Sequence, residues 1–165
     1  MIRAVVRLPD PVLTARAAPV EAVDAAVRAL VDDLIDTMRA SPACVGLAAP
    51  QIGVGLRVFV ADVTGHRNAA TCHGLVALCN PELVHAGAAA VAREGCMSVP
   101  DLTGDVARSG NVVVRGLDVD GRPRVIETDA FEARALLHEL DHLDGLLFLD
   151  RVASGRAVFP RKTYR

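Results

Sequence analysis

Two histidines spaced four residues apart constrain this chain more than any other feature, in the segment His138-Glu139-Leu140-Asp141-His142. On an α-helix, side chains at this spacing lie one above the other, about 5–6 Å apart at Cβ, so both imidazoles can reach one metal ion. The carboxylate of Glu139 is placed to exchange a proton with a water molecule on that metal. The segment therefore predicts a helix that carries a metal site.

The flanking residues favour that helix. Asp129 stands in the place of an N-cap residue with Glu132 three positions later, close to a capping box, and Gly145 is suited to end the helix. The apolar positions form a stripe that consists of Leu136, Leu140, Leu143 and Leu147. Since the histidines lie off this stripe, we expect them on a helix face that they share with Phe131, Arg134 and Ala135.

The third metal ligand decides the class of enzyme. Metzincin peptidases have a further histidine where this chain has Phe148, and only two aspartates follow His142, so the remaining ligand is expected upstream. Candidates of suitable type are His66, His73, His85, Cys44, Cys72, Cys79 and Cys96. Cys96 is favoured by its setting, because the adjacent Gly95 permits close backbone approach and a polar, turn-like exit lets a thiolate point into a cleft. For Cys44, Cys72 and Cys79 we expect small buried or half-buried thiols.

Three segments together resemble the peptide deformylase family: Gly-Leu-Ala-Ala-Pro-Gln-Ile-Gly at 46–53, Glu-Gly-Cys-Met-Ser at 94–98 and His-Glu-Leu-Asp-His at 138–142. The opening residues 9–13 are also similar to that family, and the resemblance spans nearly the whole chain. It implies a metal-dependent hydrolase that removes the N-formyl group from the N-terminal formylmethionine of newly made proteins. Its substrates would be N-formylmethionyl nascent peptides, met at the ribosome.

The resemblance also implies a metal site and its ligands. One divalent metal ion would be held by Cys96, His138 and His142. Iron(II) is the family's characteristic metal, and a mixed thiolate and imidazole site also suits zinc, nickel and cobalt.

Catalytic roles follow from the same resemblance. Glu139 would act as general base and then general acid. The side-chain amide of Gln51 and the backbone N–H of Met97 would face the developing oxyanion, although Gln51 taken alone is equally suited to bonding loop backbone. The substrate site would be lined by Gly46, Glu94, Phe131, Arg134 and Ala135, the last three walling an apolar pocket for the methionine side chain.

Departures from the family pattern leave alternatives open. The family usually has Gly where this chain has Cys44, Gln where it has Leu137 and Gly where it has Asp101. These departures leave open a catalytically weak or specialised paralogue. A zinc peptidase of another kind would require a downstream third ligand, which the sequence does not offer. A member retired to a binding role would be expected to lose Glu139, Cys96 or Gln51, and this chain has all three.

The composition predicts one soluble domain over residues 1–165. A formal charge of −2 gives no electrostatic reason to expect direct nucleic-acid binding. The sequence has no apolar run near the length of a membrane span, about 18 residues, and no secretory signal pattern, so we expect no membrane association. Four cysteines are then expected as reduced thiols or metal ligands, which favours the cytoplasm.

The predicted fold class is α+β, with antiparallel strands around a central metal-binding helix. Apolar periodicity predicts a helix over 20–39, and strands are expected at 57–63, 75–79, 111–119 and 124–127, with a hairpin turn at Asp120-Gly121. Residues 86–92 form only a small-residue patch. The basic residues near the end are expected to be a solvated tail, and they are Arg151, Arg156, Arg161, Lys162 and Arg165.

Overall fold

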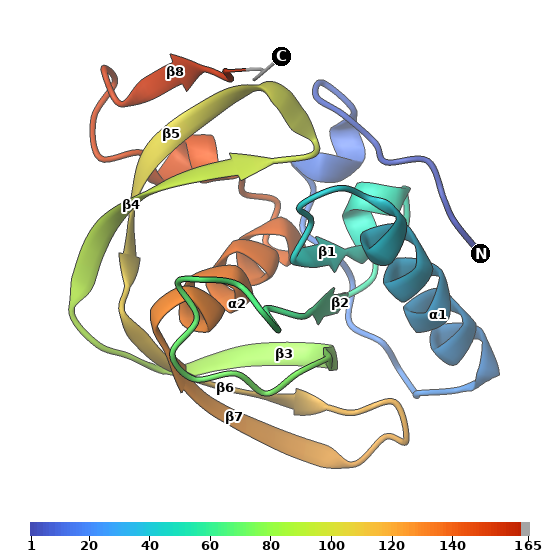
Figure 1. Cartoon of the computed structure of the whole chain (residues 1–165). Coiled ribbons are helices and arrows are strands. Elements are labelled where there is room, and N and C mark those ends of the chain that lie inside the picture. The colour runs from blue at the N-terminus through green and yellow to red at the C-terminus, as the bar shows by residue number, and fades with distance from the viewer. Residues whose placement is uncertain (163–165) are drawn as a thin grey trace.

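Antiparallel strands surround the second of two α-helices in the computed structural model, which describes residues 1–162 (Figure 1). The end of the predicted domain and Arg165 lie outside the described residues. In chain order the elements are η1 (Pro11–Leu13), α1 (Ala25–Ala40), β1 (Gly46–Ala48), η2 (Ala49–Ile52), β2 (Val58–Ala61), β3 (Val76–Ala86), β4 (Ala89–Cys96), β5 (Val99–Ser109), β6 (Asn111–Leu117), β7 (Pro123–Asp129), α2 (Ala130–Leu143), η3 (Phe148–Arg151) and β8 (Val158–Pro160). The predicted α+β class is confirmed.

Two sheets enclose α2. A five-stranded sheet runs in the order β1-β2-β3-β6-β7 and a three-stranded sheet in the order β4-β5-β8, and every strand pair is antiparallel. The predicted stripe of α2 is buried: Leu136 and Leu143 are fully enclosed and pack in one cluster with Phe59, Leu78 and Ile126 of the larger sheet. Burial of this stripe turns the opposite face of α2, with its histidines, toward the smaller sheet.

Helix α2 begins after Asp129 and ends before Gly145 as predicted, but the bonds at its N-terminus differ from the prediction. At its C-terminus Gly145 adopts φ +75°, and the N–H groups of Gly145 and Leu146 donate to the carbonyls of His142 and Asp141, which is a Schellman motif. At its N-terminus the predicted capping box is wrong. Asp129 makes no side-chain cap bond and accepts the N–H of Thr71 instead. The buried carboxylate of Glu132 accepts hydrogen bonds from the N–H of His73 and the hydroxyl of Thr128.

The first helix begins later than predicted. Asp24 caps α1 by accepting a hydrogen bond from the N–H of Val27 at 2.9 Å, so the helix starts at residue 25. The residues before it lie outside the helix, and the backbone N–H and C=O of Val20 both bond the side chain of Asn80. This long-range contact has no local sequence signal.

Strand boundaries differ where pairing is irregular. The predicted hairpin at Asp120-Gly121 is present between β6 and β7. β3 continues past its predicted end at Cys79 to Ala86, after a register shift and a positive φ at Asn80. The small-residue patch at 86–92 belongs to β3 and β4; exposed alanines form a strand there through pairing with β5.

Two further expectations concern the burial of the cysteines and the presence of membrane-spanning helices. Cys72 is exposed, whereas Cys44 is half-buried and Cys79 is buried, and all four cysteines are free thiols. No helix within residues 1–162 is long and apolar enough to cross a membrane.

Candidate active site

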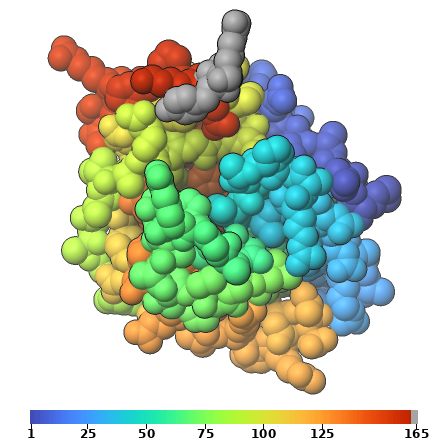
Figure 2. Space-filling model, viewed as in Figure 1, coloured from blue at the N-terminus to red at the C-terminus, as the bar shows by residue number. Residues whose placement is uncertain are grey.

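A cavity of about 650 Å³ opens between α2, β4 and the segment that leads into β1. Figure 2 shows the molecule hollowed between the segment around β1, the loop after β2 and the β4–β5 strands. β1 and β4 are each at the edge of their sheet, so two strand edges border the cavity. The lining includes every residue predicted for the site except His142, which lies behind His138, one helical turn on.

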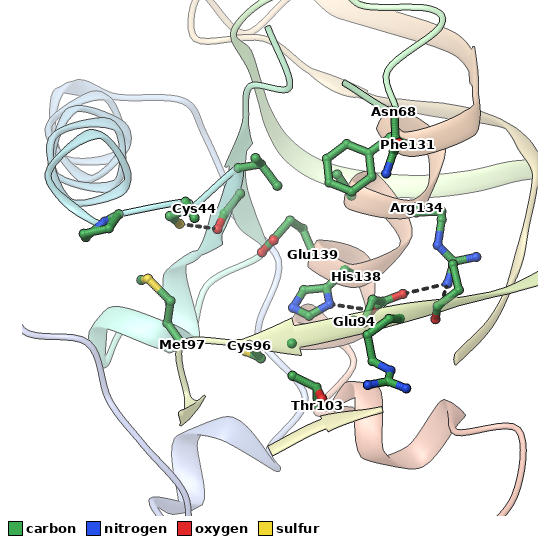
Figure 3. A pocket seen from close by; sticks show the side chains of 18 of the residues that line it. Cys44, Asn68, Glu94, Cys96, Met97, Thr103, Phe131, Arg134, His138 and Glu139 are labelled. Atoms are coloured by element: carbon green, nitrogen blue, oxygen red, sulfur yellow. Dashed lines mark hydrogen bonds and ion pairs between the residues drawn. The ribbon is translucent and has the colours of Figure 1, made fainter. Parts of the chain in front are cut away.

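The structure brings Cys96, His138 and His142 together. Their candidate ligand atoms all lie within 4.8 Å of one another, and Cys96 Sγ is 3.4 Å from His142 Nε2. Cys96 reaches this point from the end of β4 and His138 from α2 (Figure 3). The same helix supplies His142 one turn further on. The other cysteines and histidines that the sequence offered as third ligand are not part of this cluster.

The donor set fits a divalent metal. Nδ1 of His138 bonds Oε1 of Glu94 at 2.8 Å, which leaves Nε2 of that ring for a metal. Burial and the neighbouring His138 lower the pKa of His142, which keeps its imidazole neutral as ligation requires. One thiolate and two imidazoles are a set that zinc, iron, cobalt or nickel accepts.

Glu139 is buried beside the cluster and tightly packed. Its side chain lies against Gly46 at the start of β1, and a Cβ on that glycine would stand 2.9 Å from Glu139 Cδ. Burial raises the pKa of Glu139 to about 7. Its Oε2 atom has no hydrogen-bond partner among residues 1–162. A carboxyl group that titrates near neutral pH and keeps an unused oxygen is suited to proton transfer.

Gln51 bonds loop backbone and also points its amide N–H toward Cys96. Its Oε1 accepts the backbone N–H of Ala48 at 3.0 Å, which fixes the amide. Its Nε2 donates to Cys96 Sγ at 3.5 Å and to Ser98 Oγ at 3.3 Å, so the N–H group is aimed at the metal cluster. Met97 follows Cys96 and lines the same cavity.

A buried charge network supports the site, and sequence reasoning missed most of it. Arg108 bonds Glu94 through Nε and Nη2, at 2.7 and 3.0 Å, and Asp141 through Nη1 at 2.8 Å. Burial alone would raise the pKa of Glu94, but hydrogen bonds from His138 and Arg108 outweigh it and hold that pKa at about 2. Asp141 lies inside the histidine motif and Glu94 inside the motif at 94–98, and these are the sequence signals for this network, whereas Arg108 has none.

The three residues predicted to wall the substrate pocket do line the cavity. Phe131 stacks on the ring of His66 from the loop after β2, with ring centroids 3.7 Å apart. The guanidinium of Arg134 turns toward β4, where it donates to the carbonyls of Ala90 and Ala92 and to Glu94. The wall therefore presents an aromatic ring and an aliphatic stem rather than a free charge.

Position 44 shows how one departure from the family pattern is accommodated. Positive φ falls on the neighbouring Ala43, so the side chain of Cys44 needs no left-handed backbone. Its thiol donates to the carbonyl of Gly46 at 3.1 Å. Burial, with the charge of Glu139, raises the pKa of Cys44 to about 11, so this thiol stays protonated beside the cavity.

Residues 2–157 match the family model described as polypeptide deformylase. The chain belongs to this family. It is 42% identical to the peptide deformylase of Halothermothrix orenii over 146 residues, 88% of this chain and 90% of that protein. The crystal structure of peptide deformylase from Ehrlichia chaffeensis superposes with a TM-score of 0.88 at 32% identity, covering 94% of this chain and 90% of that one.

A Met-Ala-Ser-bound peptide deformylase from Acinetobacter baumannii has a TM-score of 0.84 at 32% identity, with 92% of this chain and 99% of that chain covered. The zinc peptidase alternative is not favoured, because family and fold agree over nearly the whole described chain. The retained metal cluster and Glu139 likewise give no support to a member retired from catalysis.

Proposed function

We propose that this chain is a peptide deformylase, which hydrolyses the N-formyl amide at the start of newly made proteins. The observation that carries the proposal is the buried cluster of Cys96, His138 and His142 with Glu139 beside it. The match to the deformylase family over residues 2–157 supports the substrate class.

Cys96, His138 and His142 would hold one divalent metal ion, and we propose iron(II) as the native metal on the strength of the family, with zinc, nickel or cobalt as substitutes. When bound, such an ion polarises the formyl carbonyl and lowers the pKa of a water molecule to near neutrality. Glu94 fixes the tautomer and orientation of His138 through Nδ1, and Arg108 holds Glu94 in turn.

Glu139 would take a proton from the attacking water and pass it to the departing amine nitrogen. Its pKa near 7 matches both directions of transfer. The Nε2–H of Gln51 and the backbone N–H of Met97 would donate to the oxygen that becomes negative during attack, and such donors are typically worth about 10²–10³ in rate each.

The peptide would lie extended in the cavity between the edges of β1 and β4, where backbone groups at a strand edge can pair with an added strand. Its methionine side chain would enter the pocket walled by Phe131, Ala135 and the stem of Arg134, with Gly46 and Glu94 completing the walls. The Acinetobacter baumannii relative holds Met-Ala-Ser, a peptide of this type. We propose that the reaction takes place in the cytoplasm on nascent peptides at the ribosome.

The decisive experiment is purification under anaerobic conditions, metal analysis, and a deformylation assay on formyl-Met-Ala-Ser. We expect one metal ion per chain and measurable turnover in the wild type. Glu139→Gln should keep the metal but lower the turnover at least about 10²-fold, since the amide cannot accept a proton. Glu127→Gln, at an exposed position of β7, is the matched control. Near-normal turnover in Glu139→Gln with metal retained would move proton transfer to another group.

A further inference from the structure

The C-terminal strand places a cation at the mouth of the cavity. β8 pairs with β5, and the next residue, Arg161, anchors its backbone N–H on the carbonyl of Asp101 at 2.8 Å. From there the side chain lines the cavity and Nη2 reaches the carbonyl of Cys96 at 3.5 Å. The match to the family model ends at residue 157, before this arginine.

Among the described residues 1–162, three arginines line the cavity, and Arg161 forms no ion pair with a carboxylate of that range. Arg134 is paired with Glu94 at 3.1 Å. Arg93 is paired with Asp105 at 2.7 Å and stacks on the ring of Phe159. No carboxylate within residues 1–162 forms an ion pair with Arg161, and its one bond to a carbonyl leaves further N–H donors unused.

The guanidinium of Arg161 fills the space next to Gly95 of β4, where any other residue would have a side chain. A Cβ built on Gly95 would collide with Arg161 Nη2, so the charge stands where residue 95 would project from the strand. Side chains alternate between the two faces of a strand, which puts this position on the face opposite Glu94. A peptide strand at the edge of β4 that points its methionine to the Glu94 side would point its next residue to the Gly95 side.

We infer that Arg161 is a specificity-determining residue that binds an acidic side chain at the peptide residue directly after methionine. This inference rests on the proposed function. Directly opposed side chains on paired strands have Cβ atoms about 4.5–5.5 Å apart, which a guanidinium and a carboxylate bridge readily. The chain would therefore process formyl-Met-Glu and formyl-Met-Asp sequences faster than their neutral isosteres.

The test compares kcat/KM for formyl-Met-Glu-Ser-amide and formyl-Met-Gln-Ser-amide, whose amidated ends leave the glutamate side chain as the only difference in charge. We expect the wild type to favour the glutamate peptide about two- to fivefold at low ionic strength, the range of exposed ion pairs. The ratio should fall to about one in Arg161→Gln and in high salt, drop below one in Arg161→Glu, and persist in Arg161→Lys.

The matched control is Arg156→Gln, which removes the same charge from the same segment at a residue that does not line the cavity, and it should keep the wild-type ratio. A wild-type ratio of one overturns the inference. So does an equal loss of rate on both peptides in Arg161→Gln, because that result assigns Arg161 only to support of the Cys96 carbonyl. The Kd values of Met-Glu-Ser-amide and Met-Gln-Ser-amide give the same ratio without turnover, which separates failure of this inference from failure of the proposed activity.

Discussion

Gly46→Ala is the sharpest test of how closely the site is packed. Gly46 begins β1 and lies directly against the Glu139 carboxylate. An added Cβ would stand 2.9 Å from Cδ and 3.1 Å from Cγ of Glu139. Optimal carbon contacts are about 3.5–4.0 Å, so the carboxylate must move by roughly 0.6–1 Å. Because Glu139 is buried and its backbone is held in α2, this shift falls on the side chain that handles the proton.

A displacement near 1 Å in a catalytic group can cost about 10²-fold in rate. We expect that loss in kcat for formyl-Met-Ala-Ser, with one metal still bound, since no ligand is touched. Overpacking should also lower the free energy of unfolding by about 1–3 kcal/mol. Stopped or continuous deformylation assays, metal analysis and thermal unfolding of the same preparation measure all three quantities.

Gly55→Ala is the control, because a Cβ at Gly55 has no heavy atom within 4 Å and no positive φ to strain. It should match the wild type in rate and in midpoint of unfolding. Wild-type turnover in Gly46→Ala would refute the reasoning, since it would show that Glu139 does not need its position against β1. Loss of metal in that variant would equally contradict it.

Three other predictions address the ligands, their support and the pocket. Cys96→Ala should lose most of its affinity for the metal, and metal analysis of Cys96→Ala beside His138→Ala measures the loss. Full metal occupancy and activity in Cys96→Ala would show that Cys96 is not a ligand. Glu94→Gln leaves buried Arg108 with one acidic partner, so the free energy of unfolding should fall by about 3 kcal/mol. Metal binding should weaken about 10–100-fold, because His138 loses its charged partner. Denaturant titration and metal competition measure these two quantities, and unchanged values would show that the network is dispensable. At the first peptide position, norleucine should be accepted nearly as well as methionine, because it replaces the thioether sulfur by a methylene group and keeps the length and apolar character of the side chain. Glutamate should be strongly disfavoured, because its charge would be buried without a partner. Equal kcat/KM for all three would mean that no apolar pocket exists.

Local sequence patterns predict several elements of this protein. The histidine pair, the helix around it and the turn at Gly145 depend on residues within a few positions of one another, so a single sequence predicts them. The hairpin at Asp120-Gly121 is local in the same way. The candidate ligand Cys96 is far from the histidines in the sequence, and its setting beside Gly95 together with the family resemblance pointed to it.

Tertiary structure decided what depends on contacts between distant segments. The sequence predicts that Glu132 caps α2, yet its carboxylate accepts a hydrogen bond from the backbone N–H of His73 in the loop after β2. Arg108 has no local signal, and only the pairing of β4 with β5 brings it to Glu94. The sequence predicts that Arg161 belongs to a solvated tail, but the pairing of β8 with β5 places it at the cavity. Sequence periodicity records which face of an element is apolar, while the partner of a buried charge is set by which elements pack together, and that is a property of the whole fold.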